Sequence, residues 1–292
     1  ASLVDVKGNL AIASVTTNAE AAIKGNGTIS TAGTIQVTAN GTADAFSGVM
    51  TPTISISGIK IAANILVSTL AAVQKAYIED VAIKAAAGTT VSSTFNADPA
   101  NGARAILGSS AGSLGADISY YGFTANSATA TAEATNYAYV DGASFGDYST
   151  RAGALAVTAA GSSTAIADIS AGALSAGYIS LGTAVLYAHA NGDYQAYVNT
   201  TGALLNVDSL SVNNTYEASA TAKTTQPIGG TISGFEADVN IALAAVGINA
   251  EAAIKGDGSI ITPGVVTVKA TGTATADAGV ATPMITLSGI KI

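Results

Sequence analysis

The sequence predicts an all-β fold, a parallel β-helix (β-solenoid) built from tandem repeats. Three observations lead to this prediction: an internal repeat of 231 residues, a weaker period of roughly 58 residues inside it, and segments in which apolar and polar residues alternate. Alternation with period two places successive side chains on opposite faces of a strand, so each strand is expected to bury one face.

The long repeat is marked by the octapeptide N-A-E-A-A-I-K-G, which occupies residues 18–25 and returns at residues 249–256, an offset of 231. The offset holds without a gap to residue 292, and roughly half of the 61 paired positions are identical. We therefore treat residues 1–292 as one continuous repeat array, with residues 1–231 as one period and residues 232–292 as the start of the next copy.

The shorter period is marked by a small residue or a tyrosine followed by a β-branched residue. The marker pairs are Ala22-Ile23, Tyr77-Ile78, Tyr139-Val140, Tyr197-Val198 and Ala253-Ile254. Their intervals are 55, 62, 58 and 56 residues, which together make one period of 231. The predicted sub-repeats begin near residues 18, 74, 135, 193 and 249.

Strands and turns alternate within each unit. Residues 33–39 (G-T-I-Q-V-T-A) and 264–270 (G-V-V-T-V-K-A) are rich in β-branched residues, while Asn26-Gly27 and Asp257-Gly258 are turn signals. A unit of this kind buries its apolar face by stacking on its neighbours. If each unit makes three turns of a coil, at about 4.8 Å a turn, one period extends about 55 to 60 Å as a rod.

Two other architectures stay open at this stage. Residues 61–76, with relatives at residues 9–22 and 240–253, are rich in alanine and leucine, which favour a helix. Short strands with turn signals also describe an antiparallel sandwich or a chain of immunoglobulin-like domains. Against that rival, the chain has no Trp and no repeat near 100 residues.

Composition excludes several classes of partner. The formal charge is −8 with a pI near 4.4, so nucleic acid is not an expected partner. No run of about 18 apolar residues is free of Gly, Ser, Thr or charge, so we expect no membrane insertion in this segment. The chain has no Cys, and residues 1–7 contain no secretion signal, so an exported protein would contain this chain as an internal or processed fragment.

No residue is predicted to be catalytic, to bind a cofactor or to hold a metal. His189 is the sole histidine, and the adjacent Glu79 and Asp80 are interpreted as part of a turn. Glu20 and Lys24 recur as Glu251 and Lys255, which favours a repeated ion pair over an active site. The calcium signature G-G-x-G-x-D is absent, and acidic residues such as Asp193, Asp208 and Asp257 are scattered.

Two further groups of residues are weighed as surface features. Tyr77, Tyr139 and Tyr197 hold matching places, and packing along the array is favoured over contact with a glycan or protein. Five further tyrosines add to this Tyr-rich middle region, namely Tyr120, Tyr121, Tyr137, Tyr187 and Tyr194. The acceptor pattern N-x-S/T occurs at Asn26, Asn40, Asn199 and Asn213, where a Thr-rich chain produces it by chance.

The recurring A-Y-I/V-x-D/G openings at residues 76–80 and 138–142, the G-x-I-x-V-x-A strands and the T-A-T-A tract at residues 129–132 carry a resemblance. The chain resembles the leukotoxin-type filamentous adhesins of Gram-negative anaerobes. This resemblance implies a parallel β-helical adhesin, secreted or anchored at the cell surface.

The leading functional hypothesis is a structural or adhesive extracellular fibre segment. Its expected partners are other copies in a fibre, and a host or neighbouring cell surface, matrix or glycans. One alternative is a lyase or glycosidase on a β-helix, which would need a cleft around Arg104 or Arg151 with Asp141 or Asp147. A second alternative is a solenoid that binds ice or a mineral surface through arrays of Thr.

Overall fold

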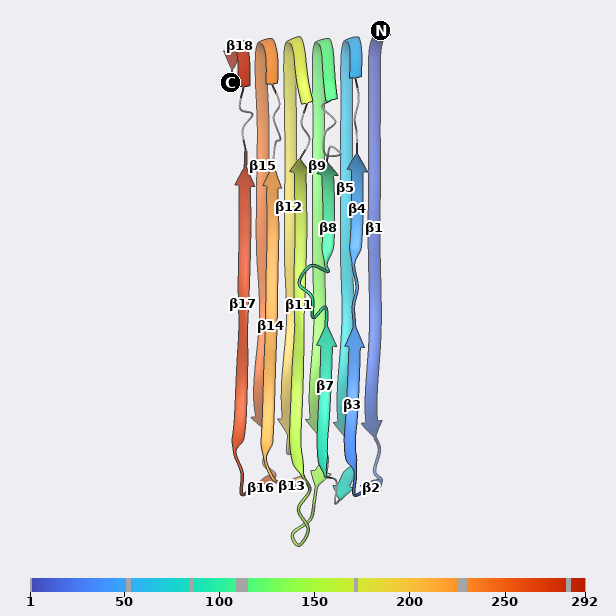
Figure 1. Cartoon of the computed structure of the whole chain (residues 1–292), viewed down its shortest axis with the longest axis vertical. Helices are drawn as coiled ribbons and strands as arrows, with labels where there is room; N and C mark the ends of the chain where they lie inside the picture. Colours follow the sequence, from blue (N-terminus) through green and yellow to red (C-terminus); the bar gives the residue numbers. More distant parts are fainter. Residues whose placement is uncertain are drawn as a thin grey trace.

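The computed structural model describes residues 2–50, 54–84, 87–108, 115–170, 173–224, 230–281 and 285–291 (Figure 1). Within them the chain is a coil of β-strands in which every strand pair is parallel. The predicted parallel β-helix is therefore confirmed, and an antiparallel sandwich is not formed. Residues 51–53, 282–284 and 292 of the matched C-terminal motif lie outside the described residues.

The described strands form three sheets. The long-strand sheet contains, in order, β1 (Ser2–Lys24), β5 (Ile54–Glu79), β9 (Gly115–Asp141), β12 (Ala173–Asn199), β15 (Gly230–Lys255) and β18 (Ile285–Lys291). The short corner sheet contains β2 (Thr28–Ser30), β6 (Ala82–Lys84), β10 (Ser144–Phe145), β13 (Leu204–Asn206) and β16 (Ser259–Ile261). The return sheet contains β3 (Thr34–Gly41), β7 (Gly88–Phe95), β11 (Ala154–Ser170), β14 (Leu210–Thr224) and β17 (Val266–Val280), and β8 (Ala103–Gly108) pairs with β11 on one side and with β4 (Ala45–Met50) on the other.

Each unit of roughly 58 residues makes one coil. The marker residues Ala22, Tyr77, Tyr139, Tyr197 and Ala253 pair with one another in adjacent long strands. The expected three turns per unit is therefore wrong. Residues 59–79 contain neither Gly nor Pro, so β5 runs on as a single strand of 26 residues where several short ones were expected.

This coil gives the chain a different shape from the expected rod. A strand of 26 residues extends about 85 Å at about 3.3 Å a residue. Four coil steps, the rise of one 231-residue period, add only about 19 Å at about 4.8 Å each. The coils stand side by side from β1 to β18 in Figure 1, and the long axis of the molecule lies along the strands.

The helix left open for residues 61–76 is not formed, because these residues lie within β5. Ala62 to Ala76 alternate between the two faces of the sheet, and Leu66 and Leu70 are buried inside the coil. Burial of one face in a stack outweighs the small helix preference of alanine and leucine.

Two apolar clusters fill the narrow interior. The cluster beside the corner sheet contains large side chains such as Ile78, Phe145 and Leu155. The second cluster, farther along the strands, is dominated by alanines on the inner faces of β9, β11, β12 and β14. Alanine lets the two sheets approach closely, and the Ser68 hydroxyl on β5 donates across the interior to the Ala45 carbonyl of β4 at 2.5 Å.

A polar seam separates the two clusters and joins the sheets. The amide of Asn136 on β9 donates to the Ala160 carbonyl of β11 at 2.6 Å, and the amide of Asn214 on β14 donates to the Tyr194 carbonyl of β12 at 2.6 Å. Both asparagines are buried, so these hydrogen bonds satisfy groups that would otherwise be costly inside the core. Tyr194 fits there because Gly192 has no Cβ, which would lie 2.1 Å from its ring.

The turns that follow four of the long strands contain a residue with an unusual backbone conformation. Gly25, Asp80, Gly142 and Gly256 follow β1, β5, β9 and β15, and all four have a positive φ. Asp80 is therefore in a turn, as the sequence predicted, whereas Glu79 is the last residue of β5. At Gly142, where φ is 62°, a Cβ would also lie 2.6 Å from a carboxylate oxygen of Asp80.

Substitution of Gly142 by Ala is expected to lower the free energy of unfolding by about 1 to 2 kcal/mol, since a left-handed conformation penalises a Cβ. Gly27→Ala is the matched control, because a Cβ there meets no atom within 4 Å. Urea unfolding followed by circular dichroism measures both changes. Equal stabilities for the two variants would contradict the assigned turn.

Candidate contact surface

The outer face of the long-strand sheet is the most distinctive surface of the described residues. Because the strands are parallel and in register, each outward residue stands about 4.8 Å from its counterpart in the next coil. The outward residues therefore form columns that run along the stacking direction. Columns far from the corner sheet differ sharply in chemistry from columns close to it.

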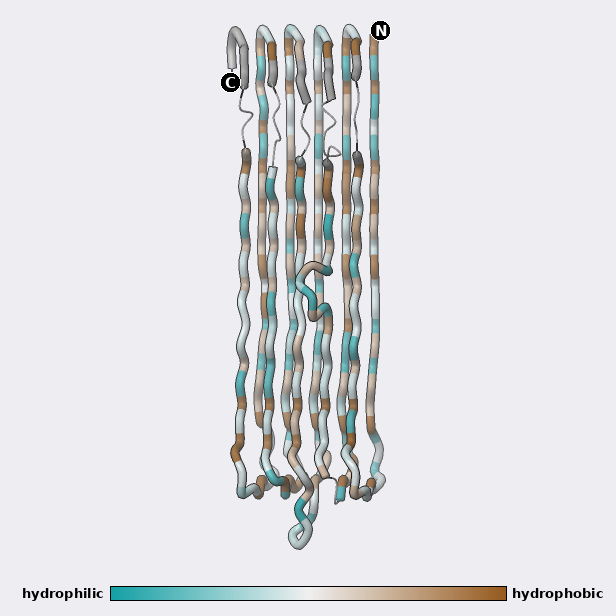
Figure 2. Tube along the Cα trace, viewed as in Figure 1, coloured by the Kyte–Doolittle hydropathy of each residue, from teal (hydrophilic) through white to brown (hydrophobic). Residues whose placement is uncertain are grey.

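Far from the corner sheet, four adjacent columns form an exposed apolar surface, which we call the apolar field. Its large exposed members are Val6, Leu10, Ile12, Ile61, Ile65, Phe123, Val185, Val239, Ile241 and Leu243. Ile12 is 67% exposed, Ile65 48% and Leu243 54%. Figure 2 likewise shows apolar residues along the whole length of the coils and not only beside the corner.

The apolar field carries no charge. Its four columns begin at Val6, Gly8, Leu10 and Ile12 of β1 and contain only apolar residues, Gly, Ser, Thr and Tyr187 as far as β15. Six residues along a strand and four coil steps give about 20 Å by 19 Å, or about 400 Å². A contiguous apolar surface of about 400 Å² is as large as the largest patch on a typical monomer, and such patches are often functional.

Close to the corner sheet, the outer face carries a ladder of three tyrosines. The rings of Tyr77 and Tyr139 stack with centroids 4.7 Å apart, and those of Tyr139 and Tyr197 with centroids 4.9 Å apart. Lys24 lies 5.7 Å from the Tyr77 ring centroid and Lys255 lies 4.9 Å from the Tyr197 ring centroid, so a cation covers each end. The three rings therefore pack on one another along the array, as predicted. Their faces are covered and are not available to stack on a sugar.

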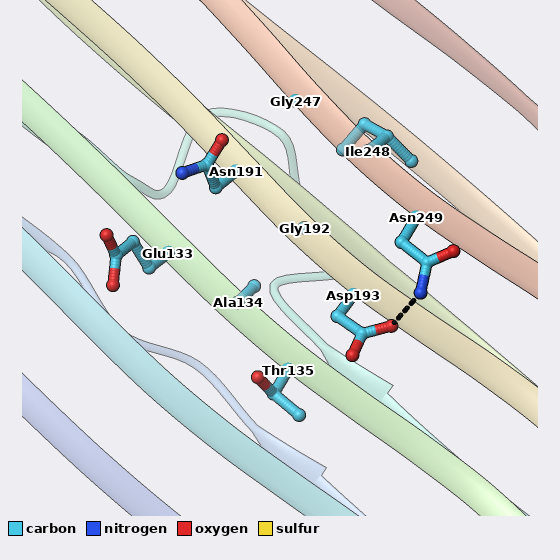
Figure 3. A pocket seen from close by; sticks show the side chains of 9 residues that line it. All are labelled: Glu133, Ala134, Thr135, Asn191, Gly192, Asp193, Gly247, Ile248 and Asn249. Atoms are coloured by element: carbon cyan, nitrogen blue, oxygen red, sulfur yellow. Dashed lines mark hydrogen bonds between the residues drawn. The ribbon is translucent and has the colours of Figure 1, made fainter.

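A polar groove of about 500 Å³ lies between the apolar field and the ladder, lined by residues of β9, β12 and β15 (Figure 3). Asp193 is its centre, because its carboxylate accepts hydrogen bonds from Asn249 at 3.0 Å, from Gln195 at 3.0 Å and from the Tyr137 hydroxyl. Glu133, Thr135 and Asn191 complete the polar lining. Three donors already occupy the Asp193 carboxylate, which leaves this groove poorly suited to a cation.

The Tyr137 hydroxyl is held in its neutral form. Burial, the hydrogen bond to Asp193 and the negative charge of that carboxylate raise the pKa of Tyr137 to about 12. Burial also raises the pKa of Tyr139 and of Tyr197 above the ordinary value. The Tyr139 and Tyr197 hydroxyls are therefore uncharged across the physiological range.

The structure places the other predicted candidates apart from one another. His189 is a half-buried outward residue of β12, tilted against Tyr187 at 5.8 Å between ring centroids. Lys24 and Lys255 form the recurring ion pairs with Glu20 at 3.7 Å and with Glu251 at 2.7 Å. Within the described residues, no group of three or more His, Asp or Glu side chains lies close enough to hold a metal ion.

The four residues required by the enzyme alternative do not meet. Arg104 pairs with Asp44 at 2.5 Å and lies over the Phe46 ring. Arg151 lies near Asp208 at 3.8 Å, at the corner end of the coil. Ile166, the partner of Arg104, is twelve residues beyond Ala154 at the start of β11, or about 40 Å along the strand.

Asp141 and Asp147 have structural hydrogen bonds. Asp141 accepts from the Asn199 amide at 2.7 Å, and Asp147 accepts from Ser149 and Thr150 in the loop after β10. The hydrogen bonds from Ser149 and Thr150, of which that from the Ser149 side chain contributes most, lower the pKa of Asp147. Of the acceptor-pattern asparagines, Asn199 is engaged with Asp141 and Asn213 donates to Ser211 at 2.7 Å.

The apolar field was missed by sequence reasoning that assigned one buried face to every strand. The signal was present in residues 61–73, where apolar residues occupy both alternating sets of positions. One set lines the interior of the coil, and the other belongs to the apolar field.

Comparison with protein-family models, with curated proteins and with solved structures finds no match to this chain. The resemblance to leukotoxin-type adhesins therefore stays a prediction. In the part of the chain that the structure describes, no helix has the length and apolar character needed to cross a membrane.

Alkaline pH is expected to destabilise the chain through Tyr137. Its pKa in the folded state, about 12, exceeds the unfolded value of about 10, so its contribution is complete below pH 10 and is lost as the pH rises toward 12. Urea unfolding at pH 9 and pH 11.5 measures the loss, which Tyr137→Phe should reduce. An identical pH dependence for the two chains would show that Tyr137 does not carry the effect.

Proposed function

We propose that this chain is a segment of a structural or adhesive extracellular fibre, whose contact surface is the apolar field. One observation carries the proposal: the coil of β15 to β17 repeats the sequence of the coil of β1 to β3 and continues the same stack without a break. An array that returns to its starting sequence in register can be lengthened by whole periods, and each period repeats the same outer surface.

The geometry of the apolar field supports contact with a broad surface. A specific protein interface buries about 800 Å² on each partner, whereas the field of this chain offers about 400 Å². Each added coil contributes about 100 Å², so contact strength would grow with the number of repeats. Such a field suits another fibre, matrix or a cell surface, and the resemblance to filamentous adhesins points to the same function and to the same location outside the cell.

The alternatives have weaker support. The arginines and carboxylates required for a lyase or glycosidase are separated along the coil, as described above. A surface that binds ice would need unbroken arrays of threonine. On the return sheet, the column that contains Thr38 and Thr158 continues with Asn213 and Lys269, so it is interrupted.

The apolar field is tested by placing charge within it. Ile65→Asp combined with Val185→Asp should reduce association of the chain at high concentration, and adsorption to a hydrophobic surface, by at least about tenfold. Thr69→Asp with Thr131→Asp is the matched control, because both positions face outward on the same sheet beside the field. Sedimentation velocity and surface plasmon resonance measure the two effects. Absence of both association and adsorption in the unmodified chain would overturn the proposal.

A further inference from the structure

The C-terminal side of the stack has an open sheet edge. β15 pairs with β12 along one side, but on its other side β18 covers only Gly230–Glu236 in the described residues. Residues 237–255 of β15 thus offer backbone N–H and C=O groups to a further strand. The question is which strand this edge is built to accept.

The structure itself shows how an equivalent edge is covered. Residues 18–25 of β1 have the same sequence as residues 249–256, and β1 is covered by β5 along its whole length. In that pairing Glu20 stands opposite Lys75, and Lys24 stands opposite Glu79. Both charges of this Glu-x-x-x-Lys pair therefore meet the opposite charge of β5.

Direct contacts reinforce the match between β1 and β5. The Tyr77 hydroxyl donates to Glu20 at 2.5 Å and accepts from Lys24 at 3.2 Å. The hydrogen bond from Tyr77 lowers the pKa of Glu20 most, with Lys24 and Lys75 adding to it against the effect of burial. Three residues of β5, namely Lys75, Tyr77 and Glu79, thus recognise the Glu-x-x-x-Lys pair of β1.

The same pair stands at the open edge. Glu251 and Lys255 bond to each other at 2.7 Å, and their side chains are 40% and 44% exposed. Lys255 covers the Tyr197 ring on the β12 side, as Lys24 covers the Tyr77 ring on the β5 side. A strand with the residues of β5 would supply Lys opposite Glu251 and Glu opposite Lys255.

A ladder of hydrogen-bonded asparagines on neighbouring strands gives the stack of coils a direction. The Asn9 amide donates to Asn64 at 2.7 Å and the Asn64 amide donates to Asn126 at 2.8 Å, so both donors point toward the C-terminal side, and Ala184 of β12 ends this ladder. Asn240 occupies the place of Asn9 in β15 and is half-buried at the open edge. Its amide is positioned to donate to an asparagine in the next coil, as Asn9 donates to Asn64.

The first coil of a second chain would match poorly. In register it would place Glu20 beside Glu251 and Lys24 beside Lys255, because these residues are equivalent in the repeat. Like charges directly opposite each other on neighbouring strands are unfavourable. The edge therefore discriminates between two coils that offer the same backbone hydrogen bonds.

We propose that the open edge of β15 to β17 is a docking surface for one kind of coil, a further copy of residues 62–108 in the register that β5 to β8 hold on β1 to β4. The match of Lys75, Tyr77 and Glu79 to Glu251 and Lys255 sets the order of coils. This inference deepens the proposed function, because it explains how a fibre keeps its 231-residue period.

The test extends the chain after Ile292 with a second copy of residues 62–108. Among residues 237–255, every second amide points to the open edge, and hydrogen exchange of these amides at low protein concentration should slow by at least about 100-fold relative to the 292-residue chain. Extension with residues 7–50 instead should protect these amides at least about tenfold less, since it places like charges together. Exchange as fast in the first extended chain as in the original would overturn the proposal, and so would equal protection by the two extensions.

Charge reversal separates recognition from folding. Lys75→Glu with Glu79→Lys in the appended copy should lose about tenfold protection, and Glu251→Lys with Lys255→Glu in the receiving strand should restore it. Failure of the second pair to restore protection would refute the role of the charges. The readout does not depend on the apolar field, so this inference and the proposed function can fail separately.

Discussion

The structure depends on one constraint, the in-register parallel pairing of each whole coil with the next. A parallel ladder over more than twenty residues leaves no freedom to shift, because a slip of one residue would turn the inner face outward. Each residue in the paired strands of an inner coil consequently has a fixed neighbour about 4.8 Å away on each side. The unit lengths differ, yet the long strands keep register, and the extra residues are placed elsewhere, as in the loop between β7 and β8.

Stacking of residues upon their counterparts explains most of the local chemistry. Alanine upon alanine gives a narrow interior, tyrosine upon tyrosine gives the ladder, and asparagine upon asparagine gives a directed chain of hydrogen bonds. Charges obey the opposite rule between β1 and β5, where Glu20 stands beside Lys75 and Lys24 beside Glu79, whereas Glu79 itself stands beside Asp141 of β9. The same geometry therefore supplies cohesion through like residues and order through unlike ones.

The sequence was sufficient to predict the fold class, because its repeats and its period-two alternation reflect the stacking directly. The sequence did not reveal how far each strand runs. The alanine-rich segment at residues 61–76 favours a helix by local preference, but it forms a strand because one of its faces is buried in the stack. The absence of Gly and Pro from residues 59–79 was the available clue to a single long strand. The groove around Asp193 could not be foreseen, because Tyr137 and Asn249 reach it from coils that are distant in sequence.

The central claim is that one coil corresponds to one unit of roughly 58 residues, and a spin-label distance tests it most directly. Ser14 and Ala245 are exposed outward residues of the same column, which passes through Thr69, Thr131 and His189. The chain has no Cys, so Ser14→Cys with Ala245→Cys can be labelled specifically. Four coil steps predict a narrow distribution near about 19 Å in double electron–electron resonance. A distance near about 55 to 60 Å, the value for three coils per unit, would contradict the account.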